Sequence, residues 1–185
     1  MKHSPKDYEI VDSVALQLRI DYGHLEKVLD VFKLAKDLGI ILIKYSALTE
    51  EQLNKIKEYD ETKDGFTIFK MVNGELKFYT FYNDSVSPYR IRSTIAHEIK
   101  HVVFLERDPT EKQEDLANHF ARYILAPTCL VMPYVGKYLE DIVSDFDISI
   151  EAAGNALLAA TNRQLYGHDK LADYERLFIS MFISR

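Results

Sequence analysis

Two histidines and a glutamate near the middle of the chain have the types and spacing of a metal-dependent hydrolase. They stand in the run His97-Glu98-Ile99-Lys100-His101. On a helix, residues four positions apart lie about 40° apart around the axis, so both imidazoles face the same way. Such a pair can reach one zinc ion at about 2.0–2.1 Å, while Glu98, offset from both, can accept a proton from the zinc-bound water. The spacing therefore predicts a zinc-dependent hydrolase, provided that a helix carries it.

The residues around the motif indicate the helix that it needs. Ser87-Pro88 is typical of an N-cap followed by proline in the first helical position, and it predicts a helix over residues 88–105. On this helix the apolar residues form one stripe, and the two histidines lie roughly opposite the centre of that stripe. One face would then anchor the helix in the core while another presents the ligands to a cleft. The stripe consists of Ile91, Ile95, Ile99, Val102 and Val103.

A third zinc ligand must come from elsewhere, because a catalytic zinc usually has three protein ligands and one open position. Residues 110–113 have the form of a capping box and predict a helix over residues 110–126, which a proline ends. Glu114 is the favoured ligand because it shares a stripe with Asn118, beside small residues that permit close helix packing. The alternative for Glu114 is a solvated surface carboxylate. The rival ligands are Glu106, Glu111 and Asp115, whereas His119 projects away and is expected at the surface.

The bulk composition is typical of a folded cytoplasmic protein. The 185 residues suffice for one domain with a core, and the hydrophobic fraction of 47% and charged fraction of 28% are ordinary. We expect no membrane association, since no apolar run is long enough to span a bilayer and no signal peptide is recognisable. The single cysteine, Cys129, excludes an internal disulfide and is expected to be a small buried side chain. A formal charge of −6 argues against general nucleic-acid binding.

The remaining patterns predict an α+β fold in the order helix, strand, helix, hairpin, then helices only. The clearest signal is Asn73-Gly74, a turn pair between two runs of aromatic and β-branched residues. We expect a core over residues 1–127, with a small, mostly antiparallel sheet packed on helices. A helical C-terminal extension over residues 128–185 should pack on it as part of one unit. The other expected helices cover residues 24–38, 49–59, 133–146, 149–160 and 171–185, and the strands cover residues 40–43, 66–72 and 76–82.

The motif and its surroundings resemble the ImmA/IrrE family of metallo-endopeptidases. That family has an A-H-E-x-x-H helix, then E-x-x-A-[ND]-x-F-A, then a leucine-rich stretch ending in proline, which residues 96–101, 114–121 and 125–127 match. The resemblance is specific over about residues 90–127 and looser upstream. It implies a minimal zincin-like fold, zinc held by His97, His101 and Glu114, and Glu98 as the base. Lys100 departs from the family's usual glycine, and we interpret this as a surface change.

The resemblance also implies a class of substrate. Members of that family typically occur in bacteria, phages and mobile elements, and cleave helix-turn-helix repressors. A strand edge near the metal could hold such a substrate by β-augmentation, and residues 76–82 are the expected strand. Three candidates for stabilising the oxyanion are Tyr82, Tyr89 and Tyr123.

Two other functions are compatible with parts of the sequence. A zinc-binding regulator, or a toxin–antitoxin component, could act by protein contact without proteolysis, although such a site would not need Glu98. Direct DNA binding is the other, because residues 138–160 have the pattern of a helix–turn–helix pair. We expect a protein partner there and no direct nucleic-acid contact, since this segment has no lysine or arginine. Its charged residues are Glu140, Asp141, Asp145, Asp147 and Glu151.

Overall fold

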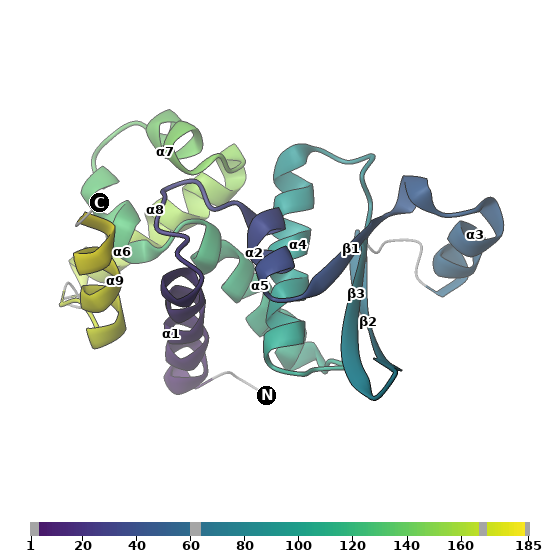
Figure 1. The fold of residues 1–185 in the computed structure, drawn as a ribbon. Helices are drawn as coiled ribbons and strands as arrows, with labels where there is room; N and C mark the ends of the chain where they lie inside the picture. The colour runs from purple at the N-terminus through teal and green to yellow at the C-terminus, as the bar shows by residue number, and fades with distance from the viewer. Residues whose placement is uncertain (1–3, 60–63, 167–169, 184–185) are drawn as a thin grey trace.

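The computed structural model describes residues 4–59, 64–166 and 170–183 of the chain. Two central helices, α4 (Pro88–Val103) and α5 (Glu111–Leu125), lie between a small sheet and most of the remaining helices (Figure 1). The fold is α+β, as the sequence indicated, and it is consistent with a small zincin-like architecture. Within the described residues, no helix has the length and apolar character that crossing a membrane requires.

The sheet contains β1 (Ile40–Lys44), β2 (Gly65–Val72) and β3 (Glu75–Tyr82) in the order β1-β3-β2. The β2–β3 pair is the predicted hairpin, with Asn73 and Gly74 at φ angles of 52° and 82°, while β1 runs parallel to β3. The sheet is therefore mixed. Because β3 lies in the centre and pairs on both sides, the expectation that residues 76–82 offer a strand edge is wrong. Over the described residues, β1 and β2 are the two edge strands of the sheet. Of these two, β2 is the one that packs against α4, the helix that carries the motif.

Helix α4 forms as the sequence predicts. Ser87 Oγ accepts a hydrogen bond from the Arg90 backbone N–H at 3.3 Å, which satisfies one of the donors left open at a helix start. The apolar stripe is buried, with Ile95 and Ile99 at 0% and 1% exposure. Arg92, also buried, donates to the Leu29 carbonyl at 3.0 Å. These contacts fix the helix on its apolar side, so its opposite face is left to border a cleft.

Helix α5 begins at the predicted capping box, in which Thr110 and Gln113 satisfy each other's backbone donors. Ala117 and Ala121 of α5 are 0% and 1% exposed, and α5 packs against α4 and α1. Small side chains at these positions allow the close helix approach that the sequence indicated. The two helices therefore hold a fixed relation across the site.

The N-terminal region differs from the prediction. Helix α1 (Pro5–Asp21) was not expected, although Ser4 and Asp7 form a capping box with proline at the first position. The helix expected over residues 24–38 begins only at α2 (Val31–Asp37). The physical reason is Arg19, a fully buried side chain whose guanidinium donates to two carbonyls of this segment, those of His24 at 2.9 Å and of Glu26, and to the Ile124 carbonyl at 3.1 Å. Residues 24–30 thus form a loop, because their carbonyls accept hydrogen bonds from the buried guanidinium instead of from helical backbone N–H groups.

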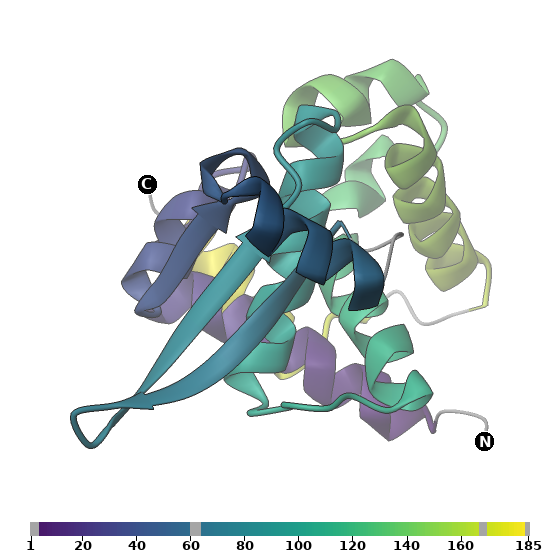
Figure 2. The same ribbon diagram turned by 90° about the vertical axis from the view of Figure 1, so that its right-hand side faces the viewer.

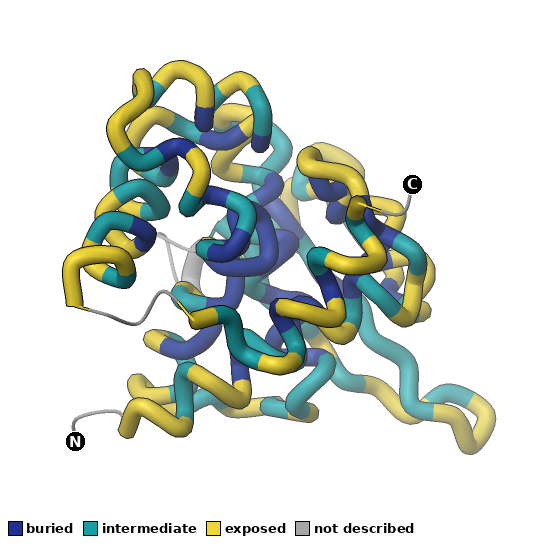
Figure 3. The backbone as a smooth tube through the Cα atoms, turned by 90° about the vertical axis from the view of Figure 1, so that its left-hand side faces the viewer, coloured by how far each residue is buried: buried dark blue, intermediate teal, exposed yellow. Residues whose placement is uncertain are grey.

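The C-terminal half is helical, as expected, but the helix predicted over residues 133–146 starts six residues late. Gly136, at a φ angle of 84°, interrupts it. The chain is buried most deeply along its central segments, where the helices meet (Figure 3). The division at residue 127 stays a prediction, and α1 packs against the C-terminal α9 as well as α5. The remaining helices are α3 (Glu50–Tyr59), α6 (Thr128–Val131), α7 (Leu139–Phe146), α8 (Ile150–Leu165) and α9 (Asp173–Ile183), with 3-10 turns at Tyr45–Ala47 and Met132–Tyr134.

Candidate active site

Three side chains converge where α4 faces α5. His97 Nε2 lies 3.0 Å from His101 Nε2 and 3.0 Å from Glu114 Oε2, and the distance from His101 Nε2 to Glu114 Oε2 is 3.7 Å. Ligand atoms around a tetrahedral zinc, at about 2.0–2.1 Å from it, stand about 3.3 Å apart. The three atoms therefore have the chemistry and the separations of a zinc ligand set. The structure brings together the residues that the sequence selected as ligands.

The other nitrogen of each imidazole is bonded to a different residue. His101 Nδ1 lies 2.8 Å from Glu106 Oε2, and His97 Nδ1 lies 3.1 Å from Asn118 Oδ1. Because a carboxylate oxygen only accepts, His101 Nδ1 donates, and its Nε2 lone pair faces the cluster. Such outer hydrogen bonds orient metal-binding histidines and increase their affinity for the metal. Asn118 is one helical turn beyond Glu114, so α5 supplies both a ligand and a support.

The pKa of His97 lies below its usual value. Burial disfavours the charged imidazolium, and neighbouring His101 adds to the effect, while Glu114 and Asn118 act in the opposite direction. His97 is therefore neutral at neutral pH. The neutral imidazole is the form with a lone pair available to a metal.

Lys100 does not lie at the surface, contrary to our prediction from the sequence. Its side chain is 1% exposed, and Nζ donates to both Glu106 carboxylate oxygens, at 2.7 and 2.5 Å, and to the Gln113 carbonyl at 3.1 Å. The helix stops at Val103, and Leu105, at a φ angle of 54°, turns the chain so that Glu106 folds back onto the last turn. That fold-back has no signal in helical periodicity. Lys100 thus compensates the charge of the carboxylate that supports His101.

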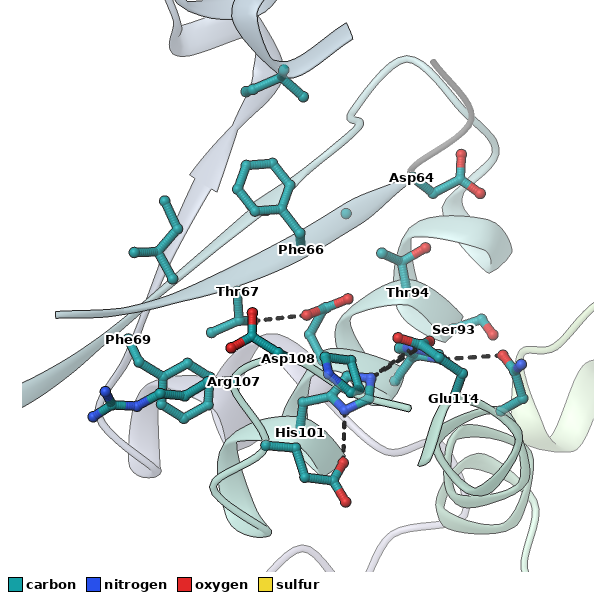
Figure 4. Close-up of a pocket in the computed structure, with 18 of the residues that line it drawn as sticks. Asp64, Phe66, Thr67, Phe69, Ser93, Thr94, His101, Arg107, Asp108 and Glu114 are labelled. Atoms are coloured by element: carbon teal, nitrogen blue, oxygen red, sulfur yellow. Dashed lines mark hydrogen bonds and ion pairs between the residues drawn. The ribbon is translucent and has the colours of Figure 1, made fainter. Parts of the chain in front are cut away.

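Glu98 lies in the same cleft as the histidines and is 6% exposed. Its Oε2 accepts a hydrogen bond of 2.8 Å from Thr67 Oγ1, which comes from β2 (Figure 4). Thr67 could not be predicted as a site residue, because nothing in a strand pattern shows which helical residue a threonine will face. The catalytic role of Glu98 stays a prediction, and Glu98 lines the same cleft as the three candidate ligands.

The cleft has a volume of 1110 Å³, with β2 along one side and α4 and α5 along the other. Consecutive residues 64–69 all line it, although alternate side chains of a strand point to opposite faces. The edge of β2 therefore borders the cleft. Helix α3 contributes Lys55 and Ile56 to the lining and stands on the far side of the sheet from α4 (Figures 1 and 2).

The other candidate residues lie elsewhere. None of the three tyrosines considered for the oxyanion is among the described residues that line the cleft. Tyr123 instead donates to buried Glu175 at 3.0 Å. His119 is half-buried rather than at the surface and pairs with Asp12 of α1 at 2.6 Å. Cys129 is buried, as expected, and burial raises the pKa of its thiol to about 12.

Residues 79–158 match the model of a peptidase family, described as the IrrE N-terminal-like domain. The matched segment runs from β3 through most of α8, so it includes both histidines, Glu98 and Glu114. Thr67 and the rest of β2 precede it. No curated protein matches the chain.

Proposed function

We propose that the chain is a zinc-dependent endopeptidase with Glu98 as its base, because residues 79–158 match the IrrE N-terminal-like domain of a peptidase family. The observation that carries this proposal is the convergence of His97 Nε2, His101 Nε2 and Glu114 Oε2 beside the Glu98 carboxylate. Two imidazoles and one carboxylate are a common ligand set of catalytic zinc, with a coordination position left for water. The ImmA/IrrE resemblance of the motif agrees with this donor set.

Each residue of the site has a defined part in the proposed peptide hydrolysis. Zinc bound by the three ligands would lower the pKa of water and polarise the scissile carbonyl. Glu98 accepts the proton of the attacking water and then delivers it to the leaving amine. Glu106 and Asn118 keep the two imidazoles in the orientation and tautomer that binding requires.

An extended peptide segment fits the cleft best. The edge of β2 borders the cleft and offers backbone donors and acceptors for β-augmentation. Phe66 and Phe69 supply apolar surface beside that edge. We therefore propose that the substrate pairs with β2, and not with β3 as the sequence had suggested.

We further propose a helix-turn-helix repressor, or a similar regulatory protein, as the substrate. The family resemblance supports this class, and so does charge. A DNA-binding protein presents a basic surface to phosphate, and the net charge of −6 on this chain favours encounter with such a partner.

The first experiment measures bound metal by elemental analysis on the wild type and on Glu114→Ala. The expected result is about one zinc per chain in the wild type and a loss or strong weakening in the variant. Full zinc in Glu114→Ala would place the third ligand elsewhere. If neither protein binds zinc supplied at neutral pH, the proposed function is wrong.

Glu98→Gln separates proteolysis from action by contact. The variant should keep its zinc and lose cleavage, because glutamine cannot accept the proton. Sequencing of new protein N-termini in cells that express the wild type or the variant would identify the substrate and the cleavage site. If the wild type and Glu98→Gln instead have the same effect on the cells that express them, the protein acts as a regulator or as a toxin–antitoxin component without proteolysis.

A further inference from the structure

We propose that Thr67 and Thr80 form a hydroxyl pair that positions Glu98, so that the strand bordering the substrate cleft also holds the base. The inference rests on the proposed function for the role of Glu98. What it adds is a role for two threonines on neighbouring strands. Thr67 precedes the segment that the family model matches.

The hydrogen bonds form a chain with a defined direction. Thr67 Oγ1 lies 2.8 Å from Glu98 Oε2 and 2.7 Å from Thr80 Oγ1. A hydroxyl has a single proton, and an ionised carboxylate only accepts. Thr67 therefore donates to Glu98, and its oxygen accepts the proton of Thr80. The order of donation is Thr80 to Thr67 to Glu98.

The pair is rigidly supported. Thr67 and Thr80 are direct partners in the antiparallel β2–β3 register, and Thr80 is 0% exposed. Threonine hydroxyls opposed in this way stabilise each other across the strands. Since χ1 of a β-branched side chain is restricted, the hydroxyl of Thr67 has little freedom to turn away from Glu98.

Gly65 allows the strand to come close enough. A Cβ atom at this position would lie 2.6 Å from Thr94 Cγ2 of α4 and 2.8 Å from the Phe81 carbonyl oxygen. Both distances are too short for real contacts, so only glycine permits this approach of β2 to α4. Two residues further along, the same approach places Thr67 within hydrogen-bond distance of Glu98.

The consequence is a fixed relation between substrate and base. A peptide paired with β2 is placed by the backbone around Thr67, and Glu98 is placed by the side chain of the same residue. A misplacement of a reacting group by about 1 Å can cost on the order of 10²-fold in rate. Thr67 and Thr80 are positioning residues, because they act through Glu98.

The test compares cleavage of unfolded, fluorescently labelled casein by the zinc-loaded wild type and three variants. Thr67→Val keeps the side-chain shape and removes the hydroxyl, and its kcat should fall about 10- to 100-fold with KM changed less than about twofold. Thr67→Ser restores the hydroxyl and should restore kcat to within a few-fold. Thr161→Val is the matched control, since its hydroxyl donates to a carbonyl within α8, away from the site, and its rate should not change.

Glu98→Gln separates failure of this inference from failure of the proposed function. An inactive Glu98→Gln beside a Thr67→Val of wild-type kcat would overturn the inference alone. A fully active Glu98→Gln would overturn the proposed function.

A crystal structure of zinc-loaded Thr67→Val gives a second readout that does not depend on the choice of peptide. The Glu98 carboxylate should move by more than about 0.5 Å, the tolerance within which catalytic groups must be held. A carboxylate that stays in its wild-type place would contradict the inference even if casein is not cleaved.

Discussion

At the scale of single residues, the least expected feature is the buried ion pair of Lys100 with Glu106. Both side chains are largely excluded from water, at 1% and 9% exposure, and the carboxylate also holds His101. Taking two charges out of water is costly, and their attraction offsets that cost only while both partners are present. The pair therefore affects both the stability of the fold and, through His101, the affinity of the site for zinc.

Lys100→Met should lower the free energy of unfolding of the metal-free protein by about 3–5 kcal/mol, because it leaves Glu106 as an uncompensated buried charge. Urea denaturation measures this. The double variant Lys100→Met with Glu106→Gln should recover much of the loss, since both charges are then gone. A single variant as stable as the wild type would show that the ion pair is not buried in solution.

Glu106→Gln should weaken zinc binding about 10- to 100-fold, because a neutral amide orients and polarises His101 less strongly than a carboxylate. Competition with a chromophoric chelator measures the affinity. The control is Glu111→Gln, an exposed residue in the first turn of α5, for which we expect wild-type affinity. Equal affinities in all three proteins would contradict the role of Glu106.

At the scale of elements, local signals determined what the sequence could predict. Helices α4 and α5 follow from their caps and apolar stripes, and the hairpin follows from Asn73-Gly74. The same capping chemistry opens α1, so that helix could have been found. The loop before α2 could not, because its carbonyls bind Arg19, and the burial of Arg19 depends on tertiary contacts such as its bond to the Ile124 carbonyl, 105 positions away in the chain.

For the site, the sequence indicated the four residues carried by the two central helices, but not the partners that other segments bring to them. His97, Glu98 and His101 follow from spacing, and Glu114 from its stripe. Strand order, which makes β2 the outer strand, depends on how β1 docks beside β3, and no periodicity encodes it. The contact of Thr67 with Glu98 and the fold-back of Glu106 onto α4 also depend on tertiary structure.

Gly65→Ala should destabilise the protein by about 1–3 kcal/mol, the usual cost of overpacking, because the new methyl group has no space between β2 and α4. It should also reduce cleavage, since β2 must move away from Glu98. Gly154→Ala is the matched control. Nothing lies within 4 Å of a Cβ there, and alanine in α8 should stabilise by up to about 1 kcal/mol. Thermal and urea unfolding of both variants measure the contrast, and a Gly65→Ala as stable as the wild type would contradict the tight packing.

At the scale of the whole molecule, one buried carboxylate connects the C-terminal helix to the helix that carries Glu114. Glu175 of α9 is 1% exposed and accepts bonds from Arg163 of α8 at 2.6 Å and from Tyr123 of α5 at 3.0 Å. Burial acts to raise the pKa of Glu175, but the bonds from Arg163, the Ala172 amide and Tyr123 outweigh it and hold the pKa below the usual 4.5. The ionised form is therefore the one that stabilises the fold.

This shift predicts how stability depends on pH. A carboxyl group whose pKa is lowered by folding stabilises the protein above its unfolded pKa of 4.5, and that contribution is lost as the pH falls through the lowered value. Glu175→Gln should cost about 3 kcal/mol at neutral pH, the lower limit for a broken buried pair, since Arg163 keeps some contact with water. The deficit should shrink below pH 4.5. Urea titrations across this range test it, and a deficit independent of pH would contradict the assignment.

The outer position of β2 has a consequence for the behaviour of the protein in concentrated solution. An exposed strand edge is a template for pairing with a second copy of the chain as well as with a peptide. The exposed side chains of Ile68 and Met71, at 44% and 59%, would favour such contacts. We expect reversible self-association in which the β2 strands of two molecules occlude each other's clefts. The rate per molecule should then fall as protein concentration rises, and the protein would be most active when it is scarce.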